Sequence, residues 1–162
     1  MNICFANKAD KYTLKDKSLL VTAIKEIAKI SGLHKLVPSS DLELSVILLD
    51  DEQITEINQQ YLSHEGPTDV ISFDYVEDFD VEIDADDEFT IGELYISLDT
   101  AQRQGKEYNK SLNDELLLYI THGILHICGY DDHCEEDIKE MRKAEQRVLT
   151  ELQEKMGRVE VI

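Results

Sequence analysis

The sequence predicts an α+β fold in one domain, residues 1–162, with a small mixed β-sheet packed against helices. The chain has 162 residues and is 42% hydrophobic, which is enough for one core and short for two domains. Runs with strand periodicity and runs with helix periodicity both occur, but they do not alternate strictly as βαβ units would require. No internal repeat and no low-complexity linker divides the chain.

Four elements are predicted before residue 63. Residues 3–5 are short and apolar, which favours a strand. Residues 18–31 have the apolar stripe of an amphipathic helix, and Gly32 can end that helix because glycine accepts the left-handed conformation. In residues 42–49 apolar and polar side chains alternate, which is the period of a strand. Either of the two aspartates that follow can cap a helix over residues 52–62. Three of its side chains are expected to face inward: Ile54, Ile57 and Tyr61.

The middle of the chain predicts two more strands and a third helix. Residues 70–75 and 91–97 are rich in β-branched and aromatic side chains, which favour strands. Between them, residues 76–88 carry eight acids in thirteen positions and predict a loop. Residues 99–108 have helical periodicity.

Two long helices are predicted in the last third. Ser111 and Asp114 match a variant of the capping box, which begins a helix that runs to Cys128. This helix is apolar on nearly all sides, so we expect it to be buried in the core. Residues 135–155 are mostly charged with a single apolar stripe, as in a helix that packs on the surface.

The net charge of −19 arises from the middle of the chain. Residues 36–102 contain 19 acids and no Lys or Arg, whereas the remainder has 16 acids and 16 bases. Such a surface keeps a protein soluble, and it is also suited to a basic protein partner. Because Lys and Arg supply most of the affinity for phosphates, the charge argues against tight, unaided binding to free nucleic acid.

Other features predict a cytoplasmic protein with no membrane association. No apolar run approaches the roughly 20 residues of a membrane span. The first residues lack the charged and apolar regions of a signal peptide. The three cysteines, Cys4, Cys128 and Cys134, are too far apart for a disulfide framework and indicate a reducing compartment.

His122 and His126 are the strongest candidates for a functional site. Four residues apart on a helix, the two imidazoles share one face within reach of a single ion. Gly129 then ends the helix, and the returning chain brings a third ligand from Asp132 or His133. Two imidazoles and one further ligand, with a water in the fourth position, are typical of a catalytic zinc site. We therefore predict one Zn²⁺ per chain, with its water held by the two histidines.

The residues beside this pair bear on its chemistry. Metalloproteases with two histidines at this spacing carry Glu directly after the first histidine as general base, and Gly123 occupies that position here. This argues against peptide hydrolysis. Cys128 and Cys134 flank the turn, but they are weaker candidates for ligands because they do not form a Cys-x-x-Cys pair.

Three blocks between residues 67 and 133 carry a family pattern. The first is Pro-Thr-Asp-Val-Ile-Ser-Phe over residues 67–73, the second is Ile-Gly-Glu-Leu-Tyr-Ile-Ser over 91–97, and the third begins His-Gly-Ile-Leu-His at His122 and continues to Gly-Tyr-Asp. In this order the blocks resemble the YbeY family, zinc-dependent endoribonucleases of bacterial ribosomal RNA maturation. The resemblance implies a metalloprotease-like (zincin-like) fold with the metal on the buried helix.

The resemblance implies a single-strand-specific endoribonuclease that acts in maturation of the 16S rRNA 3′ end and in ribosome quality control. It implies ribosomal RNA, the ribosome and small-subunit proteins as partners, and these could present RNA to a chain this acidic. Thr68, Asp69 and Ser72 would lie in the substrate cleft beside the metal, although Asp69 is also suited to bonding nearby backbone amides. Two alternatives stay open: a zinc hydrolase of another substrate such as peptides, and a non-enzymatic ribosome assembly factor.

Two positions depart from the family pattern. The family's third histidine falls at Asp132, and the spacing onward to Met141 indicates a substitution, so we prefer Asp132 over His133 as third ligand. A family arginine five residues before the motif proline is Leu62 here. His64 is then a candidate catalytic residue at the scissile phosphate, with an ordinary exposed loop histidine as the competing interpretation.

Overall fold

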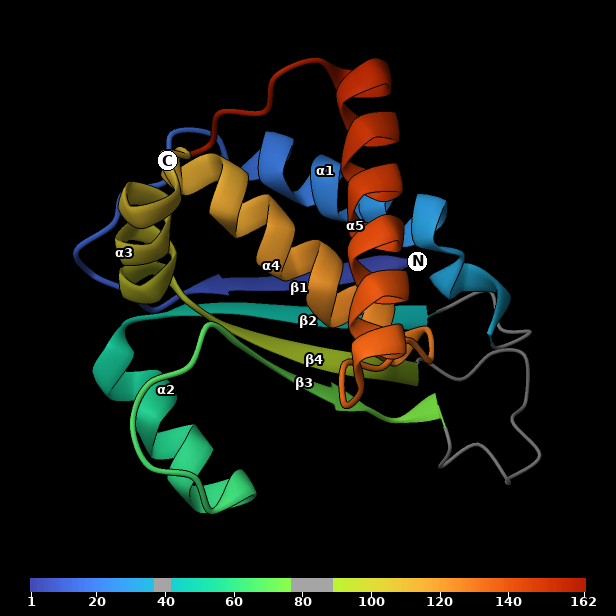
Figure 1. Ribbon diagram of the computed structural model, residues 1–162. Helices are drawn as coiled ribbons and strands as arrows, with labels where there is room; N and C mark the ends of the chain where they lie inside the picture. The colour runs from blue at the N-terminus through green and yellow to red at the C-terminus, as the bar shows by residue number, and fades with distance from the viewer. Residues whose placement is uncertain (37–41, 77–88) are drawn as a thin grey trace.

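Figure 1 shows the computed structural model, which describes residues 1–36, 42–76 and 89–162. The strands are β1 (Asn2–Asn7), β2 (Leu42–Leu49), β3 (Val70–Asp74) and β4 (Phe89–Ser97). The helices are α1 (Lys17–Ser31), α2 (Asp51–Ile57), α3 (Leu98–Tyr108), α4 (Leu112–Ile127) and α5 (Glu135–Met156), with a 3-10 turn at Leu33–Lys35 and a π-helical turn at Asn58–Leu62. The acidic loop predicted over residues 76–88 lies, after Val76, outside the described residues.

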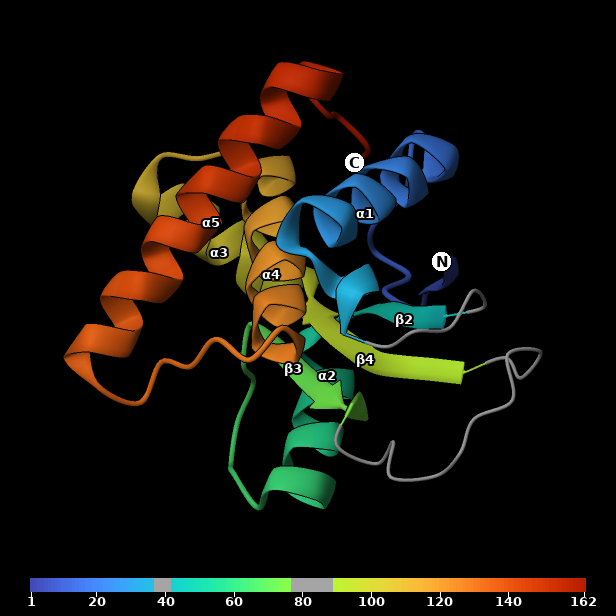
Figure 2. The same ribbon diagram turned by 90° about the vertical axis from the view of Figure 1, so that its right-hand side faces the viewer.

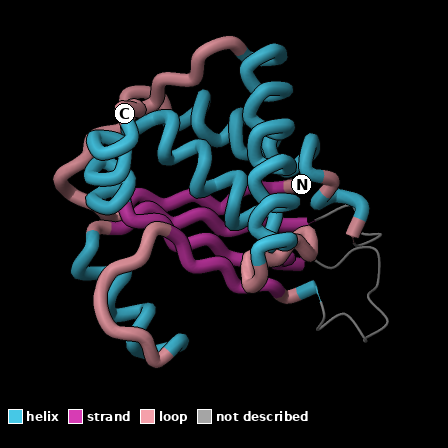
Figure 3. Tube along the Cα trace, in the orientation of Figure 1, coloured by secondary structure: helices cyan, strands magenta, loops and turns pink. Residues whose placement is uncertain are grey.

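The strands form one mixed sheet in the order β1-β2-β4-β3. β1 pairs with β2, and β2 with β4, in parallel, whereas β3 is antiparallel to β4 and lies at one edge. Figure 3 shows α1, α4 and α5 on one face of this sheet, while α2 lies on the other. The predicted α+β class with a small mixed sheet is confirmed. In the part of the chain that the structure describes, no helix is long and apolar enough to cross a membrane.

Two apolar cores hold these layers together. The larger one fills the space between the sheet and the covering helices, and α4 is buried along most of its length, as its all-round apolar sequence predicts. Figure 2, turned by 90°, shows α4 between the sheet and α5, with α1 beside α4. The smaller core, under α2, consists of Leu49, Ile54 and Ile71.

The predicted helix ends are built from local contacts. α1 ends at Gly32 with φ +87°, the left-handed conformation that glycine adopts without steric cost. Asp50 caps α2 in a capping box with Gln53, and Ser111 caps α4 in a capping box with Asp114. Each cap joins residues within a few positions, which is why the sequence predicts a box at Ser111 and a cap at one of two aspartates before α2; that the cap is Asp50, in a box with Gln53, comes from the structure.

The predicted helix over residues 52–62 is wrong in its second half. α2 ends at Ile57, and the chain continues as the wider π-helical turn. The wider turn brings Asn58 inward, where its side-chain amide donates to the carbonyl of Gly66 at 2.9 Å. Tyr61 consequently turns outward and is 61% exposed, with its ring edge-on to Phe73.

One glycine brings α4 unusually close to the sheet. A Cβ at Gly123 would lie 2.6 Å from Cδ2 of Leu94 in β4 and 3.3 Å from Cγ2 of Val70 in β3. The helix therefore touches both strands at the residue that follows His122. This close approach places the histidine face of α4 next to the edge strand.

Candidate metal centre

The two predicted histidines meet at one point on α4. The Nε2 atoms of His122 and His126 lie 3.0 Å apart, with the ring planes inclined at 86°. About a quarter of each side chain is exposed. The pair is thus mostly buried but still accessible to solvent.

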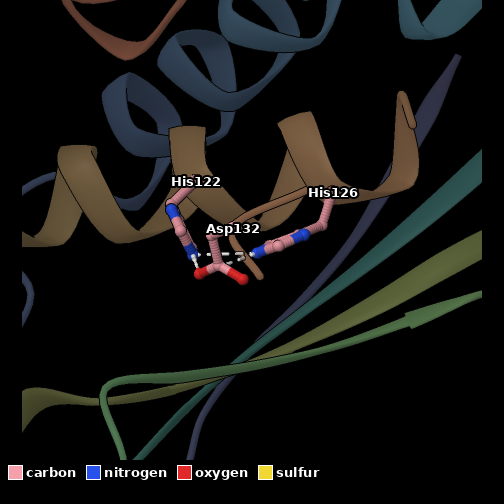
Figure 4. A group of neighbouring side chains, drawn as sticks. All are labelled: His122, His126 and Asp132. Atoms are coloured by element: carbon pink, nitrogen blue, oxygen red, sulfur yellow. Dashed lines mark hydrogen bonds and ion pairs between the residues drawn. The ribbon is translucent and has the colours of Figure 1, made fainter. Parts of the chain in front are cut away.

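A glycine turn returns the chain to this pair. Gly129 has φ +89°, and its N–H donates to the carbonyl of His126, while the N–H of Tyr130 donates to the carbonyl of Leu125. These two bonds form a Schellman motif, which ends α4 and reverses the chain. Asp132 comes next, and one of its carboxylate oxygens lies 3.7 Å from the Nε2 atom of each histidine. Figure 4 shows the three side chains converging.

The far side of each imidazole has a fixed hydrogen-bond partner. The Nδ1 atom of His122 lies 2.7 Å from a carboxylate oxygen of Glu145 in α5, and that of His126 lies 3.0 Å from the carbonyl of Tyr130. Both partners can only accept, so both Nδ1 atoms donate. The Nε2 lone pairs of the neutral rings are then directed into the site.

The environment moves the pKa of the two histidines in opposite directions. Burial lowers the pKa of His122, but the hydrogen bond and charge of Glu145, helped by Asp69 and Asp132, more than offset it, so the net shift is upward. Burial and the charge of the neighbouring ring lower the pKa of His126. The negative side chains therefore make the site favourable to positive charge at His122.

The donor set fits a divalent metal ion. Two neutral nitrogen lone pairs 3.0 Å apart repel unless a positive charge lies between them. Ligand nitrogens of one tetrahedral zinc ion are about 3.4 Å apart, close to the observed spacing. Asp132 completes a group of His122, His126 and Asp132 in which the ligand atoms all lie within 4.8 Å of one another. Two imidazoles and one carboxylate form a known catalytic zinc ligand set.

The other candidate ligands lie outside this group. The side chain of His133 is 84% exposed, and its ring is paired with Asp131, not with either histidine. Burial raises the pKa of the Cys128 thiol to about 12, so this sulfur stays protonated at neutral pH and is a poor ligand. Cys134 caps α5, with its sulfur accepting from the N–H of Asp137.

The predicted cleft residues lie at the start of β3. Asp69 accepts from the N–H of Val70 at 2.8 Å and from the hydroxyl of Thr68 at 3.1 Å, which is the local structural role considered for it. It also raises the pKa of His122 through its charge. Ser72 is half-buried in the strand itself. Asp69 thus acts electrostatically on the metal group without belonging to it.

Leu62, at the end of the π-helical turn, and His64, just beyond it, are both exposed. The backbone N–H of His64 donates to the carbonyl of Asn58. Within the described residues, no hydrogen bond or ion pair joins its ring to the metal group. A catalytic role for His64 stays a prediction.

Sequence reasoning missed Glu145. This residue lies 23 positions after His122 and on another helix. Its one signal in the sequence is its place beside the apolar stripe of α5, between Ala144 and Val148, which are both buried. A carboxylate at the border of a buried stripe needs a partner in the core.

Comparison with known proteins identifies the family. A family model described as endoribonuclease YbeY matches residues 4–153. An endoribonuclease YbeY of Fusobacterium nucleatum is 44% identical over 76% of this chain and 75% of its own, and one of Thermoanaerobacter sp. (strain X514) is 32% identical over 94% and 98%. The solution structure of TM1509 from Thermotoga maritima matches with a TM-score of 0.61 at 27% identity, covering 94% of this chain and 90% of that one. By the extent of these matches, and by the histidine pair and glycine turn described above, the chain belongs to the YbeY family.

Proposed function

We propose that the chain is a metal-dependent endoribonuclease that cuts single-stranded ribosomal RNA. The observation that carries this proposal is the group formed by His122, His126 and Asp132, on a helix and turn that match the family signature. Its role would be maturation of the 16S rRNA 3′ end and ribosome quality control.

The metal site has a clear chemical role in such a reaction. His122, His126 and Asp132 would hold one Zn²⁺, which lowers the pKa of water toward about 7 and polarises a phosphoryl oxygen. Glu145 and the carbonyl of Tyr130 keep both imidazoles in the tautomer that binds the cation. Asp69 adds negative charge beside His122, which favours binding of the cation.

The packing at Gly123 counts against a protease of the familiar type. A side chain at this position would collide with Leu94 and press on Val70. The glutamate that serves metalloproteases as general base has no space there. Peptide hydrolysis would need a base from another position.

The acidic middle of the chain suggests how the substrate arrives. Residues 36–102 have no Lys or Arg to neutralise phosphates. We propose that the ribosome or a basic small-subunit protein binds this acidic region and presents the RNA to the metal site. His64, in the exposed loop before β3, would then approach the scissile phosphate.

The test compares three substrates for the zinc-loaded protein. These are a labelled single-stranded fragment from the 3′ end of small-subunit ribosomal RNA, the same fragment in a duplex, and casein. We expect cleavage of the single strand alone, and a loss of at least a hundredfold in His122→Ala, because the cation would lose a ligand. Circular dichroism should show that the variant remains folded.

Two results would reverse the proposal. Cleavage of casein but not RNA, lost in His122→Ala, would indicate a peptidase. Absence of any cleavage together with unfolding of His126→Ala would indicate a structural metal in a non-enzymatic assembly factor.

A further inference from the structure

The outer edge of β3, on the side away from β4, has no role in the function proposed above. β3 pairs only with β4. Helix α4 packs against one face of β3 and Ile54 of α2 against the other, so among the described elements no strand pairs with its outer edge. Unpaired backbone groups along an exposed edge strand are hydrogen-bonding sites that a ligand can occupy. We propose that this edge, centred on the backbone N–H and C=O of Ser72, binds the bases of the single-stranded RNA that is cut at the metal site. This inference rests on the proposed function and adds the substrate-binding element to it.

The hydrogen-bond register shows which backbone groups face outward. The N–H of Ser97 donates to the carbonyl of Asp69, and the N–H of Tyr75 donates to the carbonyl of Ile91. In an antiparallel pair every second residue bonds to the partner strand, so Ile71 and Phe73 also bond to β4. The residues between them direct their N–H and C=O groups away from the sheet.

Ser72 is the central one of these outward-facing residues. The N–H of Val70 already bonds to the side chain of Asp69, whereas no described residue occupies the N–H or C=O of Ser72. In a strand, the N–H and C=O of one residue lie side by side on the same edge. Ser72 thus offers a donor and an acceptor next to each other.

This donor and acceptor lie on the metal side of the molecule. Val70 packs against Gly123 of α4, so the side chain of Ser72, two residues on, faces α4 as well. His122 precedes Gly123 directly. Figure 4 shows the metal group on the side of α4 that faces β3. A chain lying along this edge would pass beneath the cation.

The charge distribution favours contact with bases over contact with phosphates. No Lys or Arg occurs in residues 36–102, in α4 or in residues 128–134. Apart from the cation, these segments cannot neutralise a phosphate backbone. Hydrogen bonds to bases are therefore the interaction that this surface can supply.

The same contact accounts for a preference for single strands. Each RNA base has a donor beside an acceptor on its pairing edge, so a backbone N–H and C=O can bind any base without reading sequence. In a duplex these edges are already paired, and only unpaired bases can be bound in this way.

A pair of variants isolates the backbone contact. Ser72→Ala removes only the hydroxyl, whereas Ser72→Pro also removes the N–H, which β4 does not use. Proline is tolerated in an edge strand where the N–H faces outward. We expect the affinity of the zinc-loaded protein for a non-hydrolysable analogue of an eight-nucleotide single-stranded RNA, measured by fluorescence anisotropy, to fall about tenfold from the alanine to the proline variant. The cleavage rate at low RNA concentration should fall equally, with unchanged zinc content and unfolding temperature.

The outcomes separate this inference from the proposed function. If wild type cleaves the single strand but the alanine and proline variants differ by less than twofold, the edge contact is wrong and the nuclease proposal stands. If the loaded wild type cleaves no RNA at all, the nuclease proposal fails first.

A measurement on the unaltered protein covers the case in which Ser72→Pro does not fold. In ¹⁵N-labelled, zinc-loaded wild type, addition of a non-hydrolysable analogue of the oligonucleotide should shift the Ser72 amide resonance and slow its hydrogen exchange. The Ile71 amide, bonded to β4, serves as the internal reference. No change at Ser72 under saturating RNA, or a change with an extended peptide but not with RNA, would overturn the inference.

Discussion

Glu145 shows how a residue outside the ligand set can control a metal site. Its carboxylate accepts from the Nδ1 of His122 at 2.7 Å, and its side chain is only 14% exposed. Removal of such a partner from a metal-binding histidine typically lowers metal affinity 10–100-fold, because the ring loses its tautomer and orientation. We expect this loss in Glu145→Ala, measured by zinc competition with a chromogenic chelator.

Glu140→Ala is the matched control for that variant. Glu140 lies on the same helix, but its partner is Lys143 at the surface. The Glu140→Ala variant loses one carboxylate from α5 but no contact with α4, so its zinc affinity should equal that of wild type. An equal loss in both variants would mean that the general negative charge of α5 matters, not the contact with His122.

The choice between Asp132 and His133 is a second prediction at this scale. A carboxylate oxygen of Asp132 lies 3.7 Å from the Nε2 of both His122 and His126, whereas His133 faces Asp131 at the surface. Asp132→Ala should therefore lose most of its bound zinc after dialysis, and His133→Ala should keep about one ion per chain. Metal analysis by mass spectrometry decides the point, and the reverse pattern would assign the third ligand to His133.

At the scale of elements, the contact between α4 and the sheet depends on Gly123. The added methyl in Gly123→Ala would lie 2.6 Å from Cδ2 of Leu94 in a packed core. Overpacking of this kind costs about 1–3 kcal/mol, more than the gain of about 1 kcal/mol in helix propensity. We expect a lower free energy of unfolding in urea and, because His122 is adjacent, weaker zinc binding.

A double-mutant cycle tests this explanation. Leu94→Ala removes the group that the new methyl would meet, so Gly123→Ala should cost less in that background than in wild type. Equal costs in both backgrounds, or a stabilised Gly123→Ala single variant, would mean that the helix has room to move.

Local elements and local parts of the site could be predicted from the sequence, whereas contacts between elements could not. The capping box at Ser111, the histidine pair and the glycine turn each depend on residues within a few positions. The π-helical turn depends on Asn58 reaching the carbonyl of Gly66, and the role of Glu145 depends on how α5 packs on α4. No periodicity within one segment contains that information.

At the scale of the whole molecule, a carboxylate network joins segments far apart in the chain. Asp51, at the start of α2, accepts from the hydroxyls of Ser97 and Thr100 and from the guanidinium of Arg103. Its own N–H donates to Asp99, which in turn accepts from the loop after β1. The network thus connects the carboxyl ends of the three parallel strands, β1, β2 and β4. The position of the whole sheet relative to α2 and α3 depends on this network.

This network predicts a pH dependence of stability. Burial alone would raise the pKa of Asp51, but the hydrogen bonds from Ser97, Arg103 and Thr100 outweigh it and hold the folded-state pKa below the ordinary value of about 4. The stabilisation is therefore fully present above pH 4 and is lost as the pH falls through the folded-state pKa. At pH 7, Asp51→Asn should lower the free energy of unfolding by about 1–2 kcal/mol, and the deficit should shrink toward pH 3.

Asp10→Asn, an exposed control, should show no deficit at either pH. If urea denaturation gave the same Asp51→Asn deficit at pH 7 and pH 3, the negative charge of Asp51 would contribute nothing to the free energy of unfolding.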